Sequence, residues 1–479
     1  MKKHVNGLQK NGFVGGGCQS EINCVPRPFV DGLETIEPKL HSVSGDFEDP
    51  PECYIKSYCK DEGNASCRFI RPTSYSIIQD AKSFEKKKIP FGVVLTPLAV
   101  PSSLEEQISC VDYSSRIIPR CLRCLAFINP GFVIINSGEF ECNLCLMKNQ
   151  ITPEISSAWD NHEQGPELKK SVFDIIVPKG FHVDSLVTPV ILVCLELTPK
   201  TILSGIFVQA LSNIQTTLEN IDYDLKIGII TYDSNINFYS IPDDESQMPS
   251  IIRLMDHEDA FGALGFDDLF LSVSDTTQRS KLERLFEILY SFCDKQYQLY
   301  SSRKKELTKS EASIGSCLQV ISDVLKEVGG RAIIFSSTPC YSGPGAFNDN
   351  NSQKDEQPFK CNNIFFQKIA KKLNEQRISV DLFLVDNDEF QIQTIGLVSS
   401  LTGGTVYHYP IWDQFLYSEK FYYEIYRNLT RYQGYEVVCK LRMSMGILLD
   451  KYYTPSGTIH TPDFKLAHLN SDSYIAISL

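Results

Sequence analysis

Apolar residues in the centre of the chain follow two alternating patterns. The run Val190–Leu195 is apolar throughout, which is typical of a strand buried on both faces of a parallel sheet. Within Ile202–Glu219 the apolar residues recur at intervals of three and four, which predicts an amphipathic helix. The alternation continues with further predicted strands at Leu225–Tyr232, Arg331–Ser336, Ser379–Val385 and Thr405–Tyr409. Predicted helices lie between them at Leu282–Tyr290, Ile314–Val328, Phe365–Gln376 and Ile392–Thr402. Residues 185–412 are therefore expected to form a doubly wound α/β domain.

One segment of this region departs from the parallel pattern. Ile236–Ile241 alternates apolar and polar residues directly after a predicted strand, so it is expected to be an antiparallel hairpin partner. A doubly wound sheet with one antiparallel strand is the order expected of a von Willebrand A-type domain.

The regions on either side are predicted to be richer in β structure. Before the central domain, residues 56–114 contain β-rich runs such as Ile89–Leu95. After it, residues 413–479 begin with a short predicted helix at Tyr422–Thr430 and continue with the alternating segment Tyr435–Arg442. Residues 1–55 are rich in Gly, Pro, Asn and Ser and are predicted to be mostly disordered, and residues 151–184 are predicted to be a polar linker.

Four cysteines have the spacing of a metal site. Cys121 and Cys124 form one C-x2-C pair, Cys142 and Cys145 form a second, and 17 residues separate the pairs. Two such turns can place four thiolates at the corners of a tetrahedron, which zinc prefers. Residues 115–150 are therefore predicted to be a zinc ribbon. Because four sulfur ligands leave no open coordination position, the zinc is predicted to be structural.

Composition and charge narrow the class of protein. The length of 479 residues predicts two to four domains, and no apolar run approaches the roughly 18 residues of a membrane span. The first ten residues lack the apolar core of a signal peptide, so the 16 cysteines are expected in a reducing compartment. The net charge of −13 argues against nucleic acid as the main partner.

No catalytic or magnesium-binding motif is recognisable. A-type domains often bind magnesium through Asp-x-Ser-x-Ser after the first strand, but here the sequence has Glu196, Thr198 and Lys200. The positive charge of Lys200 would repel a divalent cation, so we expect no functional metal at this position. The phosphate-binding, serine-hydrolase and zinc-protease motifs are also absent, which predicts that the protein is not an enzyme.

The order of these segments closely resembles the cargo-selecting adaptor subunit of the COPII vesicle coat. The segments Cys67–Tyr75 and Arg120–Pro130 look like that family's entry into its β-sandwich and its zinc ribbon. Ile227–Ser240, Gly329–Ala346 and Ser379–Leu384 resemble strands and loops of its trunk domain. The GTPase-activating subunit of the same coat shares the architecture, but its first two ribbon cysteines are farther apart in sequence. The C-x2-C spacing at Cys121 therefore favours the cargo-selecting subunit. The resemblance therefore implies an A-type trunk, a four-cysteine ribbon and a β-sandwich.

The resemblance also implies function, partners and location. A member of the family is an adaptor that binds cargo export signals and pairs with the GTPase-activating subunit for transport from endoplasmic reticulum to Golgi. Expected partners are that subunit, the small GTPase of the coat, and cargo membrane proteins including SNAREs. The implied location is the cytoplasm, with peripheral contact at the cytosolic face of the endoplasmic reticulum membrane, on COPII-coated vesicles and at the Golgi membrane.

Two departures from the family pattern change these expectations. The family's pocket for acidic signals uses an arginine before the first ribbon cysteine and a basic residue after the second. Arg120 occupies the first position and is the expected cargo-binding residue, but Leu125 occupies the second. The family also continues with further sandwich strands, a helical domain and a gelsolin-like domain, so we expect a C-terminally truncated chain with an incomplete sandwich.

Two other functions remain as alternatives at this point. A zinc-ribbon nucleic-acid-binding protein would need a basic stripe on the ribbon, which Leu125, Phe127 and Ile128 interrupt. A metal-dependent adhesion protein is opposed by Lys200 and by the absence of a signal peptide.

Overall fold

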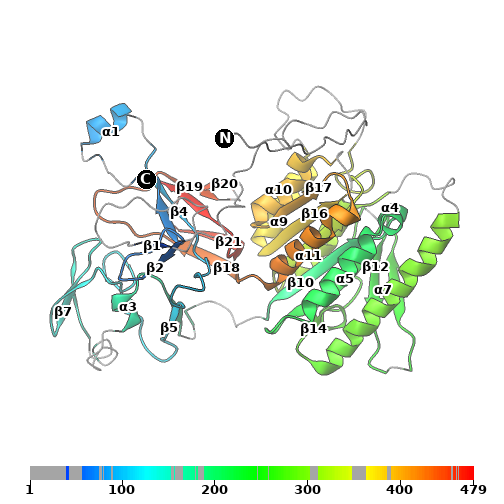
Figure 1. Cartoon of the computed structure of the whole chain (residues 1–479), viewed down its shortest axis with the longest axis horizontal. Helices are drawn as coiled ribbons and strands as arrows, with labels where there is room; N and C mark the ends of the chain where they lie inside the picture. The colour runs from blue at the N-terminus through cyan, green and yellow to red at the C-terminus, as the bar shows by residue number, and fades with distance from the viewer. Residues whose placement is uncertain are drawn as a thin grey trace, which may run out of the picture.

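The computed structural model of the chain describes most of its residues in two adjoining regions. The described residues are 39–41, 57–74, 78, 80–87, 90–152, 156, 165–178, 180–181, 188–244, 246–256, 258–302, 311–347, 363–385, 390–454, 457–459, 461 and 463–479. In Figure 1 the α/β region lies on the right, and a β region with the ribbon lies on the left. Most of the predicted disordered segment 1–55 lies outside the described residues, as does part of the predicted linker.

The larger sheet has β10 (Val190–Glu196) at its centre, with the strand order β13-β12-β11-β10-β15-β16-β17 and β14 paired to β11. Strands β11, β10, β15, β16 and β17 run parallel. Strand β12, the antiparallel strand we expected, pairs antiparallel with both β11 and β13, so β13 runs in the direction of β11, and the short β14 is a second antiparallel strand. The other bounds are β11 (Lys226–Tyr232), β12 (Ile236–Ser240), β13 (Ser250–Leu254), β14 (Leu271–Ser272), β15 (Gly330–Ser336), β16 (Ile378–Val385) and β17 (Val406–Tyr409).

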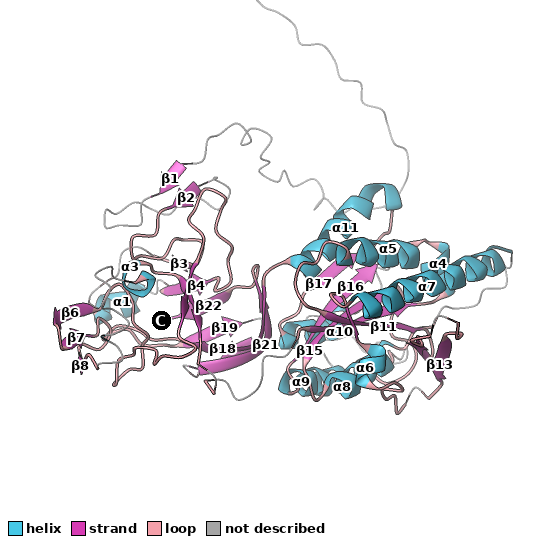
Figure 2. Ribbon diagram, turned by 90° about the horizontal axis from the view of Figure 1, so that it is seen from below, coloured by secondary structure: helices cyan, strands magenta, loops and turns pink. Residues whose placement is uncertain are grey.

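Helices cover both faces of this sheet, as Figure 2 shows. Val190, Leu192 and Cys194 pack into the core on one face, whereas Ile191, Val193 and Leu195 pack into the core on the other. This confirms the prediction that the continuous apolar run is a strand buried on both sides. The helices are α4 (Pro199–Leu203), α5 (Ile206–Leu218), α6 (Phe266–Leu269), α7 (Thr276–Ser302), α8 (Ile314–Leu325), α9 (Ile364–Glu375), α10 (Ile392–Thr402) and α11 (Gln414–Thr430).

Helix α11 corrects the predicted boundary at residue 413. We expected residues 413–479 to return to β structure after a short helix, but α11 begins at Gln414 and packs against α5. Phe421, Ile425 and Leu429 lie in the same core as Val193, so the helix belongs to the α/β domain. Its start was missed because the first turn exposes Phe415 and Leu416 and so lacks a clear buried face.

Two β-sheets enclose the smaller core of the second region. The larger has the order β20-β19-β22-β4-β3, and β18 pairs with β21 in the other. Strands from residues 70–95 and 451–478 therefore lie side by side in one sheet, as the predicted incomplete sandwich requires. The bounds are β3 (Ile70–Pro72), β4 (Gly92–Leu95), β18 (Gln433–Lys440), β19 (Lys451–Thr454), β20 (Gly457–Ile459), β21 (Asp463–Asn470) and β22 (Ile475–Ser478).

Short elements surround the sandwich, and one of them shows that part of the expected linker is folded. β9 (Phe173–Ile176) pairs with β5 (Ser109–Asp112), so part of the predicted linker 151–184 is folded. β1 (Lys39–His41), inside the predicted disordered segment, pairs with β2 (Ser57–Cys59). Both pairings join segments distant in sequence, and strands of three or four residues carry too little periodicity to be predicted. The remaining elements are α1 (Ala81–Lys87), α3 (Pro166–Lys169), β6 (Val133–Asn136), β7 (Glu139–Glu141) and β8 (Lys148–Gln150).

A buried arginine connects the two regions. Arg331 on β15 is fully buried, and its Nη2 lies 2.5 Å from an oxygen of the equally buried Asp381 on β16. The guanidinium also donates to the side chain of Asn428 at 2.6 Å and to Oε1 of Gln433, the first residue of β18. Burial alone would raise the pKa of Asp381, but the charge of Arg331 holds that pKa below its ordinary value.

The same arginine satisfies the buried end of helix α11. The last carbonyl groups of a helix lack partners within it and carry partial negative charge. Here the carbonyl of Asn428 accepts from Arg331 Nη1 and from Gln433 Nε2, and that of Leu429 accepts from the Tyr223 hydroxyl at 2.7 Å. The helix, the sheet and the first sandwich strand therefore share one network of hydrogen bonds.

Replacing Arg331 with Ala should lower the free energy of unfolding by about 3–5 kcal/mol, because Asp381 would remain buried without its counter-charge. Urea denaturation followed by circular dichroism measures this change. Arg377→Ala is the matched control, since Arg377 pairs with Glu436 of β18 at the same junction but both side chains are partly exposed. We expect the control to lose about 1 kcal/mol or less. Equal losses in the two variants would contradict the role given to Arg331.

Candidate zinc site and the adjoining arginine

The two cysteine pairs form two turns with the same backbone geometry. In the first, the Leu125 amide donates to the Cys121 carbonyl at 2.9 Å, and in the second the Leu146 amide donates to the Cys142 carbonyl at 2.8 Å. Leu125 and Leu146 both have φ of 58°, the left-handed region that non-glycine residues seldom adopt. Each turn thus directs its two cysteine side chains to the same side.

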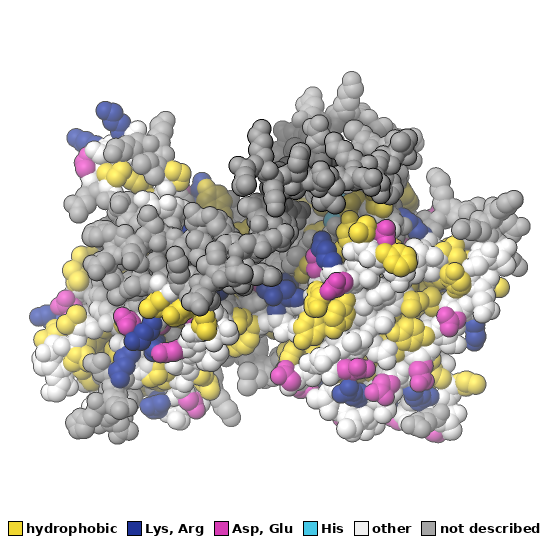
Figure 3. Space-filling model, in the orientation of Figure 1, with side chains coloured by type: hydrophobic (Ala, Val, Ile, Leu, Met, Phe, Trp, Pro, Cys, Tyr) yellow, Lys and Arg dark blue, Asp and Glu magenta, His cyan; other side chains and the backbone are white. Residues whose placement is uncertain are grey.

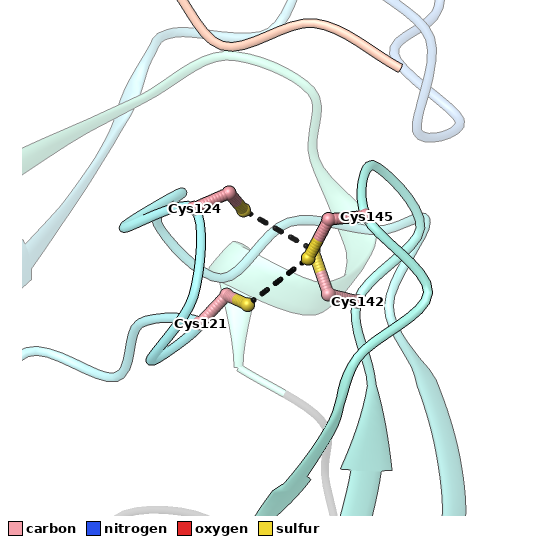
Figure 4. Close-up of side chains that lie close together, drawn as sticks. All are labelled: Cys121, Cys124, Cys142 and Cys145. Atoms are coloured by element: carbon pink, nitrogen blue, oxygen red, sulfur yellow. Dashed lines mark hydrogen bonds between the residues drawn. The ribbon is translucent and has the colours of Figure 1, made fainter. Parts of the chain in front are cut away.

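The four cysteine sulfurs converge on one point, as Figure 4 shows. All four lie within 4.8 Å of one another, with Cys121 3.4 Å from Cys145 and Cys124 3.6 Å from Cys142. A tetrahedral zinc ion with Zn–S bonds of about 2.3 Å requires sulfurs about 3.8 Å apart. The geometry and the donor set therefore fit a structural zinc ion. Within the described part of the chain, this is the one cluster of three or more His, Cys, Asp or Glu side chains able to hold a metal.

The surroundings of the thiols shift the pKa values of two of the cysteines in opposite directions. Burial would raise the pKa of Cys121, but backbone amides of Cys124 and Arg123 and neighbouring side chains lower it to about 6. Burial and the adjacent cysteines raise the pKa of Cys124 to about 12. One thiolate therefore forms readily while its neighbour is held as a thiol. A dication among the sulfurs would favour thiolate at both positions.

Packing and hydrogen bonds fix the ribbon around the cluster. Phe132 and Phe140 stack with ring centres 5.3 Å apart, in a core that includes Cys121 and Cys142. Asn149 accepts from the Leu122 amide at 2.9 Å and donates to the Cys121 sulfur at 3.6 Å. Sequence reasoning missed Asn149, because nothing in the cysteine spacing specifies a polar partner for a sulfur.

The segment after β18 ties the ribbon to the sandwich. Arg442 Nε donates to the Cys124 carbonyl at 2.9 Å, and the Met445 amide donates to the Leu144 carbonyl at 3.1 Å. Both contacts join residues about 300 positions apart in the sequence, so no local pattern could have predicted them. They hold both cysteine turns against the sandwich.

Arg120, the predicted cargo-binding residue, lies close to two aromatic rings beside the first turn. Its guanidinium carbon is 4.5 Å from the centre of the Phe127 ring and 4.8 Å from that of Phe181. Among the residues that the structure describes, none accepts a hydrogen bond from the guanidinium. Leu125 lies half-exposed in the same turn. The site thus offers one oriented cation next to an apolar side chain.

The position that binds magnesium in many A-type domains is filled by protein groups. The buried carboxylate of Glu196 accepts from the Thr198 hydroxyl at 2.8 Å and from the Ser336 hydroxyl at 2.9 Å. It also accepts from the amides of Ser337 and Thr338 and from the Thr338 hydroxyl. Lys200 donates to the Ser337 carbonyl at 3.1 Å. These groups connect the ends of β10 and β15.

Two segments of the chain match models of known protein families. The family model for the Sec23/Sec24 trunk domain matches residues 188–429, which is half of the chain, and that for the Sec23/Sec24 zinc finger matches residues 118–154. The trunk match ends within α11. No helix in the described residues has the length and apolar character needed to cross a membrane.

Curated relatives and one solved structure match most of the chain. The protein transport protein SEC24 A of Arabidopsis thaliana is 26% identical over 459 residues, which are 91% of this chain and 42% of that protein. Protein transport protein Sec24A of Homo sapiens is 24% identical over 435 residues, 87% of this chain and 38% of that protein. The chain thus spans about two fifths of these relatives. The crystal structure of the human COPII-coat protein Sec24c matches with a TM-score of 0.78 and 22% identity, covering 92% of this chain and 60% of that one.

Replacing Cys142 with Ser should release the zinc ion and unfold residues 115–150, because one of four ligands is lost and the ribbon core is small. Atomic emission should find less than half of the zinc held by the parent chain, and limited proteolysis should cut within the ribbon. Cys110→Ser is the matched control, since Cys110 is exposed and lies outside the cluster. Full zinc retention by the Cys142 variant would contradict the assignment of Cys142 as a zinc ligand.

Proposed function

Because the chain belongs to the Sec23/Sec24 family, we propose that it is a COPII coat adaptor that binds cargo export signals for transport from endoplasmic reticulum to Golgi. The observation that carries this proposal is the presence of both family segments, ribbon and trunk, in one chain whose sandwich and trunk are joined through Arg331. The proposed role is structural, through binding surfaces, and involves no catalysis.

The signal-binding role rests on the surroundings of Arg120. The guanidinium makes cation–π contacts with the Phe127 and Phe181 rings, and no described residue accepts a hydrogen bond from it. An arginine held in this way can donate two parallel hydrogen bonds to one carboxylate. The exposed Leu125 next to it would contact an apolar side chain. The favoured ligand is therefore a peptide in which a carboxylate lies next to an apolar residue.

The departure at Leu125 lowers the expected affinity for purely acidic signals. A basic residue in its place would add a second charge-assisted hydrogen bond, which typically contributes about 1.5–3 kcal/mol. We propose that this chain binds acidic export signals weakly, or selects signals that combine one carboxylate with an apolar residue.

The proposed partners follow from the same family membership. They are the GTPase-activating COPII subunit, the small GTPase of the coat, and cargo membrane proteins including SNAREs. The proposed location is the cytosolic face of the endoplasmic reticulum membrane, COPII-coated vesicles and the Golgi membrane. Co-purification tests the pairing, because the proposal requires a second protein with a ribbon and a trunk to accompany this chain.

A nucleic-acid-binding ribbon is not favoured. Leu122, Leu125 and Leu146 are all exposed on the cysteine turns, where a nucleic-acid-binding ribbon would present basic residues. On the face in Figure 3, acidic side chains lie beside basic ones over both regions. With a net charge of −13, the chain has no excess of positive charge to bind phosphate.

Arg120→Ala should weaken binding of a fluorescent peptide with a Glu-Leu signal about tenfold to a hundredfold, because the carboxylate loses its charge-assisted partner. Fluorescence anisotropy measures the dissociation constant. Arg116→Ala is the matched control, since Arg116 also lies over an aromatic ring, that of Tyr113, but donates to the Asp112 carbonyl. Leu125→Arg should tighten binding of a diacidic peptide. Unchanged binding by the Arg120 variant would refute the proposed site without affecting the family assignment.

A further inference from the structure

A second arginine lies buried at the junction between the trunk and the sandwich. Arg431 directly follows the last residue of α11, and Tyr432 alone separates it from β18, where the two regions meet (Figure 1). Only 5% of its side-chain surface is exposed. Its amide donates to the Arg427 carbonyl at 3.0 Å and so closes the last turn of the helix. The side chain of Arg431 is thus held where the helix gives way to the first sandwich strand.

The guanidinium of Arg431 has one edge without a partner among the described residues. Its Nη1 lies 3.5 Å from Oδ2 of Asp472, but its Nε and Nη2 are buried and donate to no acceptor. These two nitrogens direct their N–H groups in parallel, and this edge of an arginine binds anions in a bidentate manner. Most buried polar groups have a hydrogen-bond partner, so the edge is expected to bind an acceptor from outside the chain.

The neighbouring Arg427 shows how the same edge is satisfied by a carboxylate. Its Nε donates to Oδ2 of Asp472 at 2.9 Å, and its Nη2 donates to Oδ1 at 2.5 Å. Both oxygens of Asp472 are therefore engaged by Arg427, whose side chain is 64% exposed. Arg431 has only the longer contact with the same carboxylate. One negative charge is thus shared by two arginines.

The buried carboxylate of the Arg331 network is already engaged. Asp381 Oδ2 accepts from Arg331, and Oδ1 accepts from the Thr405 amide at 2.7 Å. His468 adds no charge of its own, because burial together with the charges of Arg331 and Arg431 lowers its pKa to about 3. The three arginines of the junction therefore share two carboxylates.

Other groups of this network lack a partner in the described part of the chain. Arg331 Nε is buried and donates to no acceptor, and neither does the hydroxyl of Ser379, which pairs with Arg331 across β15 and β16. Gln433 Oε1 already accepts from Arg331 and from the Tyr435 hydroxyl. The unpartnered nitrogens of both arginines are donors only, so the group that satisfies them must be an acceptor.

We propose that Arg431 binds a small monovalent anion, chloride, on its Nε–Nη2 edge at the junction of trunk and sandwich. A chloride ion accepts both hydrogen bonds and supplies the negative charge that the shared carboxylate does not. A water molecule would accept the hydrogen bonds but would leave the buried guanidinium without a full counter-charge, which is costly. The ion must be small, because the two donor nitrogens have no exposed surface.

The site is buried but lies close to solvent. Asp472, in the turn between β21 and β22, is 40% exposed and contacts Arg431. An ion can therefore reach Arg431 from the side of this turn. Because Arg431 connects α11 to β18, the bound anion would stabilise the junction that Arg331 also stabilises. The inference depends on these contacts alone and is independent of the proposed cargo site.

The test compares thermal unfolding of the 479-residue chain in sodium chloride and in sodium gluconate at one ionic strength, followed by circular dichroism. Gluconate is too large for a site whose donors have no exposed surface. The unfolding midpoint should rise by about 2–4 °C with chloride and then level off, because a ligand of the folded state stabilises it until the site is saturated. Screening of exposed ion pairs is equal in the two salts and does not saturate in this way.

Arg431→Met should abolish the dependence on chloride, because it removes both donors and keeps much of the apolar stem. Arg377→Met is the matched control and should keep the dependence, since Arg377 lies at the same junction but forms a partly exposed pair with Glu436. A crystal of the parent chain grown with bromide gives a second measurement that does not require a folded variant. Its anomalous signal should lie within hydrogen-bond distance of Nε and Nη2 of Arg431.

Equal unfolding midpoints of the parent chain in chloride and in gluconate would overturn the inference, as water would then satisfy the two nitrogens. A bromide crystal without anomalous signal beside Arg431 would overturn it as well. The same holds for a chloride effect that is equally large in the Arg431 variant, because the ion would then bind elsewhere.

Discussion

The ion pair between Arg331 and Asp381 is the interaction on which the arrangement of the two regions depends. A buried charge is costly unless it is paired, and here α11 and β18 supply further acceptors to the two terminal nitrogens of Arg331, while its Nε has no partner among the described residues. The trunk sheet, the last trunk helix and the first sandwich strand must therefore adopt their positions together. His468 of β21 lies close enough to contact Gln433, and burial together with the charge of Arg331 lowers its pKa to about 3. It therefore stays neutral beside the arginine.

The connections that begin at the Arg331 network continue from the trunk to the four-cysteine cluster. Strand β18 begins at the arginine network, and the segment that follows it carries Arg442 and Met445 to the cysteine turns. The zinc site then fixes a ribbon whose own apolar core is small. Arg120, the proposed signal-binding residue, lies directly before the first cysteine turn, which these contacts hold against the sandwich.

The surroundings of Glu196 and of the two cysteine turns explain residues that their motifs alone do not. Glu196 occupies the place of a metal-binding aspartate, but its five protein donors link the loop after β10 to that after β15. Leu125 and Leu146 adopt a backbone conformation that usually favours glycine, and each donates its amide to a cysteine carbonyl that closes its turn. In both cases the neighbouring atoms decide the role of the residue, and its position in a motif does not.

The sequence alone determined the features that repeat over short distances. The cysteine spacing specified the zinc ligands, and the unbroken apolar run at Val190 specified a strand buried on both faces. Only the tertiary structure decided that α11 belongs to the trunk, that β9 pairs with β5, and that Phe181 stacks on Arg120. The contacts of Arg331 were likewise decided only by the tertiary structure. The physical reason is that periodicity and ligand spacing are local properties of a chain, whereas these contacts join residues tens to hundreds of positions apart and depend on how the elements pack.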